Sequence, residues 1–137
     1  MSTPAFISTC DLCDAHKSDS SGAFRVLPPW FTEYGSSLRF AGEVSTVRCL
    51  EDNSRVKEAV QTPGLGRVLV VDGGGSLRRS LIGGNLAADA AKNGWAGLVG
   101  MGAVRDKAEL SACAIGIRAM GLIPMPTDRQ NQGQRDV

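Results

Sequence analysis

The pattern of apolar and polar positions predicts a central run of strand, helix and strand. Residues 68–71 and 96–101 are continuous apolar runs, which is typical of strands buried on both faces. Between them, apolar positions in residues 81–93 recur near a helical spacing. We therefore predict a β-α-β unit, whose two strands lie parallel in one sheet.

The flanking sequence predicts the other elements of an α/β fold. Residues 41–50 alternate in polarity, as expected for a strand with one face in the core. Short helices are predicted at 54–60 and 107–114, the second capped by Asp106, and a last strand at 115–124. Near the N-terminus, Ser8 or Thr9 can cap a helix that buries small hydrophobic side chains. After Pro126 the sequence is polar, and we predict no further element.

Both central strands are followed by glycine-rich sequence. Residues 73–75 are three glycines, and Gly100 and Gly102 flank Met101 at the end of the second run. Glycine permits tight turns and the close approach of a ligand or of another backbone. We predict that these two turns face each other and that Arg105 and Asp106 carry the chemistry between them.

Length and composition limit the possible class of protein. The chain has 137 residues with 42% hydrophobic and 21% charged side chains, which predicts a single globular domain over residues 1–137. Its formal net charge is +1, so no overall field attracts nucleic acid or a membrane surface. The sequence has neither a long apolar span nor a secretory signal, and its four cysteines are scattered. We predict a cytoplasmic protein.

The cysteines allow two interpretations. Cys10 and Cys13 have C-x-x-C spacing with His16 nearby, which is compatible with zinc. Structural zinc sites normally need four ligands, however, and Cys49 and Cys113 stand alone. The alternative is that the cysteines are packed side chains of a reduced protein.

Several kinds of catalytic site are disfavoured by the residues. The glycine runs complete neither G-x-G-x-x-G nor a phosphate loop, which disfavours a nucleotide site. The only histidine is His16, so a Ser-His-Asp or Cys-His enzyme is disfavoured, and proton transfer would require water. Asp106 is a ligand suited to Mg²⁺ or Mn²⁺, and Arg105 offers a planar fork for a 2-oxo acid. The alternative is that Arg105 and Asp106 form a simple surface ion pair.

The order of several motifs resembles a known family. The segments CDLCD, FAGEVSTVRCLEDN, GRVLVVDGGGSLRRSLIGGNLA, NGWAGLVGMGAVRD and IGIRAMGLIPMPT resemble the regulator of ribonuclease E activity A (RraA-like) family. That family overlaps with the class II 4-hydroxy-4-methyl-2-oxoglutarate/4-carboxy-4-hydroxy-2-oxoadipate aldolases. The resemblance implies a three-layer β/β/α sandwich of the swivelling (phosphohistidine-domain-like) type. It also implies a homotrimer with active sites between subunits, and residues 1–137 lack the family's C-terminal strands.

The resemblance also implies roles for particular residues. Arg105 would bind the 2-oxo acid and stabilise its enolate, and Asp106 would bind the divalent metal. The backbone of Gly83, Gly84, Asn85 and Leu86 would bind the substrate carboxylate. The aldolases have an aspartate where this chain has Gly84, which weakens the metal site.

Three functions therefore remain open from the sequence. The first is a metal-dependent aldolase that cleaves 4-hydroxy-4-methyl-2-oxoglutarate to pyruvate, with possible oxaloacetate decarboxylase activity. The second is a non-enzymatic regulator that binds ribonuclease E or its helicase partners. The third is a catalytically silent member of the family, as Gly84 suggests.

Overall fold

The computed structural model describes residues 7–137, which divide into two units. The first ends at Trp30 and contains the helix α1 (Thr9–His16). The second, Phe31–Val137, contains all the strands and the remaining helices. No helix within residues 7–137 combines the length and the apolar character needed to span a membrane.

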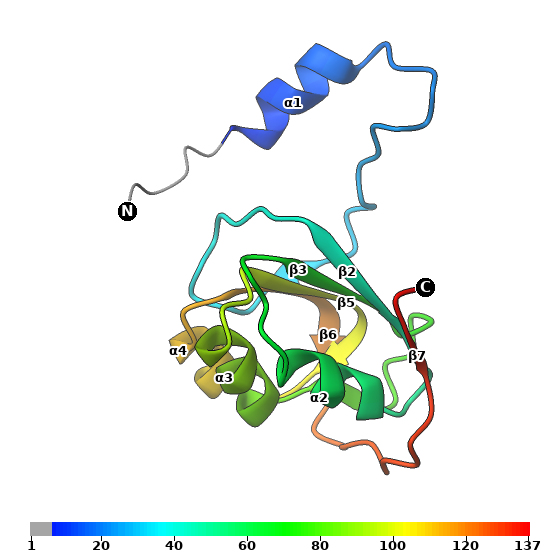
Figure 1. The fold of residues 1–137 in the computed structure, drawn as a ribbon, viewed down its shortest axis with the longest axis vertical. Coiled ribbons are helices and arrows are strands. Elements are labelled where there is room, and N and C mark those ends of the chain that lie inside the picture. Colours follow the sequence, from blue (N-terminus) through cyan, green and yellow to red (C-terminus); the bar gives the residue numbers. More distant parts are fainter. Residues whose placement is uncertain (1–6) are drawn as a thin grey trace. The chain divides into compact units, whose positions relative to one another are not determined.

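The second unit is a mixed α/β fold with a seven-stranded sheet (Figure 1). Its strands are β1 (Thr32–Glu33), β2 (Val44–Arg48), β3 (Val68–Asp72), β4 (Ser80–Ile82), β5 (Gly97–Val104), β6 (Gly116–Leu122) and β7 (Gln134–Arg135). Its helices are α2 (Ser54–Val60), α3 (Gly84–Lys92) and α4 (Lys107–Ala112).

The central strands of the sheet run parallel. The order is β1-β6-β5-β3-β2-β7, and β4 pairs with β5 outside this path. Strands β2, β3, β5 and β6 pair in parallel, as do β4 and β5, whereas the short outer strands β1 and β7 are antiparallel. The predicted β-α-β unit is confirmed, because β3 and β5 are parallel neighbours joined through α3.

One face of the sheet forms the hydrophobic core. Figure 1 shows α2, α3 and α4 gathered on the same side of the sheet. Alternate residues of the central strands, such as Leu69, Leu98 and Ile117, are almost fully buried in this core. Small residues of α3, such as Ala87 and Ala90, are fully buried and let the helix lie close to the sheet.

The neighbouring positions of β5 and β6 pack against an aromatic ring. A Cβ atom on Gly97 or Gly116 would overlap the ring of Phe40. Gly97 and Gly116 are register partners on adjacent strands, so together they leave a flat space that the ring fills. These two glycines are required for packing and not for a turn.

Several predictions about the elements are wrong. Residues 81 and 82 belong to the strand β4, and α3 begins only at Gly84. Gly100 and Gly102 lie inside β5, which continues to Val104, so the second predicted glycine turn does not exist. The helix α1 has no buried residue, although we expected it to bury its small side chains.

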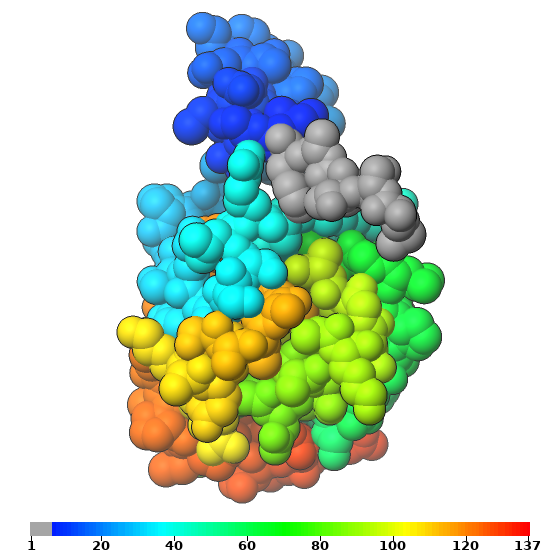
Figure 2. Space-filling model, turned by 90° about the vertical axis from the view of Figure 1, so that its left-hand side faces the viewer, coloured from blue at the N-terminus to red at the C-terminus, as the bar shows by residue number. Residues whose placement is uncertain are grey.

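The C-terminal residues are ordered by contacts with other elements, contrary to the prediction. Strand β7 pairs with β2, and Arg55 of α2 donates hydrogen bonds to the carbonyl oxygens of Gly133 and Asn131. Figure 2 shows the orange to red C-terminal residues along the lower edge of the molecule, below the yellow-green α3. The polar character of this segment reflects hydrogen bonding to the fold and not a free tail.

Candidate active site

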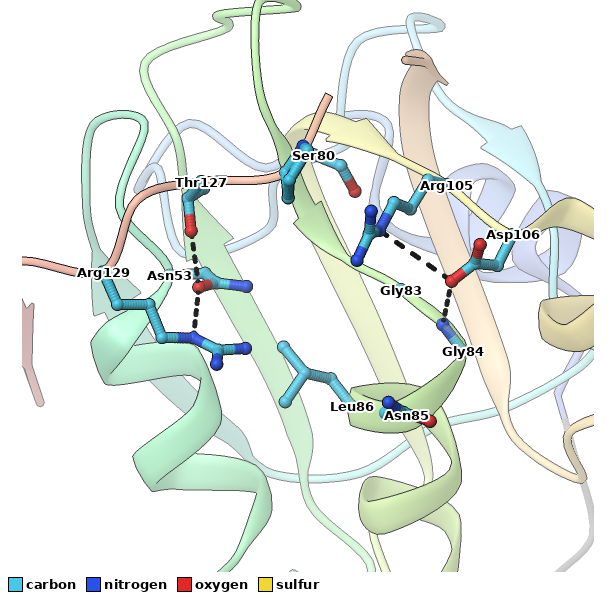
Figure 3. A pocket seen from close by; sticks show the side chains of 11 residues that line it. Asn53, Ser80, Gly83, Gly84, Asn85, Leu86, Arg105, Asp106, Thr127 and Arg129 are labelled. Carbon is cyan, nitrogen blue, oxygen red and sulfur yellow. Dashed lines mark hydrogen bonds and ion pairs between the residues drawn. The ribbon is translucent and has the colours of Figure 1, made fainter. Parts of the chain in front are cut away.

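A pocket of about 160 Å³ lies where several parallel strands end (Figure 3). Ligands commonly bind at the carboxyl ends of parallel strands. One side, here called the helix wall, consists of residues that follow β4 and β5: Gly83, Gly84, Asn85, Leu86, Arg105 and Asp106. The other side, the strap wall, consists of Asn53, Ser80, Pro126, Thr127 and Arg129. All predicted site residues therefore line this pocket.

Asp106 connects β5 to the beginning of α3. It adopts a left-handed conformation with φ 59°, which aspartate tolerates better than most residues. Its Oδ2 accepts a hydrogen bond of 2.9 Å from the backbone N–H of Gly84, the first residue of α3. The prediction that its side chain caps α4 is wrong, because that side chain makes no capping bond there. The carboxylate instead satisfies a free N–H of α3, and a negative charge at that end of a helix is stabilising.

Arg105 lies beside Asp106 and extends into the pocket (Figure 3). Its Nε is 3.9 Å from Oδ2 of Asp106, and its Nη1 donates a weak hydrogen bond of 3.4 Å to the carbonyl oxygen of Pro124. Arg105 and Asp106 thus form the ion pair that was considered as the alternative, but its distance of 3.9 Å makes it a weak one. With 41% of its side chain exposed, Arg105 keeps donors available to a ligand.

The beginning of α3 approaches Arg105 and Asp106 closely because it contains two glycines. A Cβ atom on Gly83 would lie 2.9 Å from Oδ2 of Asp106. A Cβ atom on Gly84 would lie 2.8 Å from Cβ of Glu109. A side chain at 83 would therefore crowd Asp106, and one at 84 would crowd Glu109 of α4.

The first turn of α3 offers backbone donors to the pocket. The first N–H groups of a helix have no partner within the helix. Gly84 donates to Asp106, whereas the N–H groups of Asn85 and Leu86 have no acceptor within residues 7–137. Such donors at a helix N-terminus favour an anion such as a carboxylate.

Asn53 organises the strap wall. The residue is 6% exposed, and its Nδ2 donates to the carbonyl oxygen of Leu81 at 2.9 Å. Its Oδ1 accepts hydrogen bonds from Oγ1 of Thr127 at 2.8 Å and from Nε of Arg129 at 2.9 Å. The sequence did not predict a site role for Asn53, Thr127 or Arg129.

Asp52, the residue before Asn53, fixes the same segment. Its Oδ2 accepts hydrogen bonds from the N–H groups of Gln130 and Gln132, and its Oδ1 accepts two from Ser54. Burial raises the pKa of Asp52, but the hydrogen bonds from Ser54, Gln130 and Gln132 together lower it below its ordinary value. An ionised carboxylate thus holds the segment that carries Arg129.

The triple-glycine turn has a different role from the one predicted. Residues 73–75 do not line the pocket. The N–H of Gly75 donates to the carbonyl oxygen of Met101, and a Cβ atom on Gly73 would lie 2.7 Å from that same oxygen. These glycines allow close approach to β5, so the glycine pair that faces Arg105 and Asp106 is Gly83 and Gly84.

The pocket offers a partial set of metal ligands. Within residues 7–137, no three His, Cys, Asp or Glu side chains are grouped to hold a metal ion. Oδ1 of Asp106 has no hydrogen-bond partner in this part of the chain. Because Mg²⁺ commonly takes one or two protein carboxylates and keeps several waters, the pocket fits an ion bound by Asp106, substrate and water.

The cysteines do not contribute to this site. None of Cys10, Cys13, Cys49 and Cys113 is in a disulfide. Burial, reinforced by the negative charges of Asp52 and Asp72, raises the pKa of Cys49 to about 11, so its thiol stays protonated near neutral pH.

Comparison with known proteins identifies the family. Residues 9–137 match the family model described as "RraA-like: Aldolase/RraA", and the chain belongs to this family. It is 58% identical to the "Putative 4-hydroxy-4-methyl-2-oxoglutarate aldolase" of Albidiferax ferrireducens, covering 98% of this chain and 82% of that protein. It is 51% identical to the protein of the same name from Cupriavidus necator, covering 94% and 79%.

Solved structures share the fold but carry other descriptions. The "RNA-processing inhibitor RraA" of Thermus thermophilis has a TM-score of 0.89 at 43% identity, covering 97% of this chain and 78% of that one. A protein of Geobacillus kaustophilus, described as an S-adenosylmethionine:2-dimethylmenaquinone methyltransferase, has a TM-score of 0.87 at 41% identity, covering 96% and 79%. Because these names differ for one fold, the fold alone does not determine the function.

Proposed function

We propose that this protein is a divalent-metal-dependent aldolase that cleaves 4-hydroxy-4-methyl-2-oxoglutarate into two molecules of pyruvate. The observation that carries the proposal is the meeting of Arg105, Asp106 and the first turn of α3 in one pocket. Two relatives at 58% and 51% identity bear the name of this activity. Oxaloacetate decarboxylation needs the same pyruvate enolate, and we include it in the proposal.

The helix wall has the groups that the 2-oxo acid end of the substrate requires. The free N–H groups of Asn85 and Leu86 bind the carboxylate next to the keto group. The guanidinium of Arg105 binds the keto oxygen, where negative charge develops as the bond between C3 and C4 breaks. Arg105 therefore stabilises the enolate more strongly than the substrate, which is the condition for catalysis.

Proton transfer in this pocket requires water. The lining residues include no histidine, and Asp106 is already bonded to Gly84. Water accepts the proton of the 4-hydroxyl group while the bond breaks, and returns a proton to C3 of the enolate, giving the second pyruvate. A Mg²⁺ or Mn²⁺ ion bound at Asp106 would add Lewis-acid polarisation of the keto group.

We extend the proposal to the assembly and the detailed fold type. The fold would be the three-layer β/β/α sandwich of the swivelling type, and the protein a homotrimer with pockets between subunits. The four free cysteines favour a reducing compartment, and we propose the cytoplasm. Sedimentation of the purified protein would test the trimer.

The deciding experiment measures pyruvate release from 4-hydroxy-4-methyl-2-oxoglutarate by coupling to lactate dehydrogenase. We expect activity with Mg²⁺ or Mn²⁺ that is abolished by a chelator and restored by added metal. Absence of pyruvate under all these conditions would refute the aldolase.

The alternative is a regulator that binds ribonuclease E or its helicase partners without catalysis. The likeness to the RNA-processing inhibitor, together with Gly84 at a position where a carboxylate would strengthen the metal site, favours this function. Pull-down with purified ribonuclease E at physiological salt tests it. Binding that survives Arg105→Ala would place the regulatory surface outside the pocket.

A further inference from the structure

The strap wall carries a guanidinium group that the proposed reaction does not use. Arg129 is exposed, and its one hydrogen bond is from Nε to Oδ1 of Asn53. Within residues 7–137, no carboxylate forms an ion pair with it. Its two terminal nitrogens therefore remain available as donors.

This guanidinium is held in place before any ligand binds. Asn53 is buried and is itself fixed by Leu81, and the N–H of Gln130, the next residue, donates to the carboxylate of Asp52 at 2.6 Å. Both the side chain of Arg129 and its backbone are thus anchored to the loop before α2. A preorganised donor loses less entropy on binding than a mobile surface arginine.

Arg129 and Arg105 face each other across the pocket. Figure 3 shows their guanidinium groups on opposite sides, both directed toward the space between the two walls. The lining residues contain these two arginines and one carboxylate, Asp106, which lies beside Arg105. The pocket is therefore positively charged, and its unpaired charge lies on the Arg129 side.

We propose that Arg129 binds the second carboxylate of a dicarboxylic 2-oxo acid whose keto-acid end is bound by the helix wall. This inference rests on the proposed function for the placement of the keto-acid end at Arg105. A substrate with a single carboxylate would leave Arg129 without a partner, whereas a dicarboxylate pairs with both arginines. Arg129 is then the residue that selects dicarboxylates.

Two unreactive probes separate this contact from catalysis. 2-Oxoglutarate and 2-oxopentanoate have the same keto-acid end and chain length, but only the first has a terminal carboxylate. The full chain is titrated with each probe in a calorimeter, in buffer that contains Mg²⁺. The two titrations give the ratio of the dissociation constants of the two probes. We expect the wild type to bind 2-oxoglutarate about tenfold to hundredfold more tightly, the range for a hydrogen bond to a charged group.

Variants assign this preference to Arg129. Arg129→Gln should bring the ratio close to one without changing 2-oxopentanoate binding, and Arg129→Lys should keep part of the preference. Lys92→Gln removes a positive charge from the far end of α3, about 12 Å from its first turn, and should keep the full ratio. Thermal unfolding of each variant checks that it is folded.

Each outcome bears on the inference. The assignment is overturned if Arg129→Gln retains the preference for 2-oxoglutarate, or if Lys92→Gln loses it to the same extent. It is also overturned if the wild type binds both probes equally or binds neither. Pyruvate release from 4-hydroxy-4-methyl-2-oxoglutarate is measured separately on the same protein. If the preference depends on Arg129 but no pyruvate is released, the aldolase proposal is refuted and the dicarboxylate site stands. If pyruvate is released but the preference is absent, the dicarboxylate site is refuted and the aldolase proposal stands.

Discussion

The two walls of the pocket present arginines that are fixed in different ways. Arg105 directly follows β5, so the sheet itself sets its position. Arg129 is held by one side-chain hydrogen bond to Asn53, 76 residues away in the sequence. The helix wall is therefore part of the regular framework, whereas the strap wall depends on two buried polar side chains, Asp52 and Asn53. We expect the helix wall to determine reactivity and the strap wall to determine substrate selectivity.

The largest expected effect is on the helix wall. Arg105→Ala removes the donor to the developing enolate and should lower kcat for pyruvate release about 100-fold or more. Because the side chain is 41% exposed, the thermal unfolding temperature should change little. Lys92→Ala is the control. Activity retained in Arg105→Ala would show that the keto-acid end does not bind at the helix wall.

The next prediction concerns the anchor of the strap wall. Both oxygens of Asp52 accept hydrogen bonds from N–H groups. In Asp52→Asn the NH₂ group of the amide replaces one of these oxygens, and it cannot accept the hydrogen bond. We expect a loss of about 1.5–3 kcal/mol in the free energy of unfolding, the range for hydrogen bonds to charged groups. Asp128→Asn is the control, because Asp128 has no hydrogen bond or ion pair within the described chain.

The difference between wild type and Asp52→Asn should depend on pH. The pKa of Asp52 is lower in the folded protein than in the unfolded chain. Its contribution to stability is therefore complete above the unfolded pKa and is lost as the pH falls through the folded pKa. Thermal unfolding in a series of acidic buffers should show the two proteins converging as the pH falls, and a constant difference would contradict this role.

A substitution at the start of α3 should lower the free energy of unfolding by as much as Asp52→Asn or less. Gly84→Ala places a Cβ atom 2.8 Å from Cβ of Glu109, and such overpacking costs about 1–3 kcal/mol. Gly100→Ala is the matched control, because the nearest atom to its new Cβ would be Cδ1 of Ile82 at 3.9 Å. The comparison is made by chemical unfolding. The same overlap predicts that Gly84→Asp does not restore a metal ligand unless α4 moves.

The smallest expected effect is that of Thr127→Val. This change removes one of the two hydrogen bonds to Oδ1 of Asn53 and leaves the one from Arg129. We expect a loss of about 1 kcal/mol in stability and an unchanged preference for 2-oxoglutarate over 2-oxopentanoate. Ser111→Ala removes an exposed hydroxyl that bonds within its own helix and serves as the control. A lost preference in Thr127→Val would mean that Asn53 alone cannot hold Arg129.

The apolar pattern predicted only the part of the helix wall that follows β5, where Arg105 and Asp106 lie. Residues 83–86 were assigned from the family resemblance, because strand β4 was not predicted. The apolar runs 68–71 and 96–101 define β3 and β5, and residues that follow a buried parallel strand lie at the ligand-binding edge of the sheet. Two predictions from glycine were wrong: the turn at Gly100 and Gly102, and the placement of residues 73–75 at the site. A glycine that lies within a strand, or that approaches the Met101 carbonyl, looks the same in sequence as one that faces a ligand.

The strap wall could not be predicted in the same way. Its polar residues, Thr127 and Arg129 among them, have the composition of a solvated tail, and no periodicity relates them to Asn53. The available signal was weak: Asp52 and Asn53 together follow β2, and both can accept several hydrogen bonds. Their distant partners become apparent only in the folded chain.

The bond between Asn53 and Arg129 also bears on the order of folding. The contact between Gly84 and Asp106 spans 22 residues, whereas this one spans 76. Closing the longer loop costs about 1 kcal/mol more in chain entropy. We therefore expect the helix wall to form first during refolding and the strap wall to close last. Pulsed hydrogen exchange should then detect protection at Gly84 before protection at Gln130. A refolding molecule would thus form the wall that determines reactivity before the wall that determines selectivity.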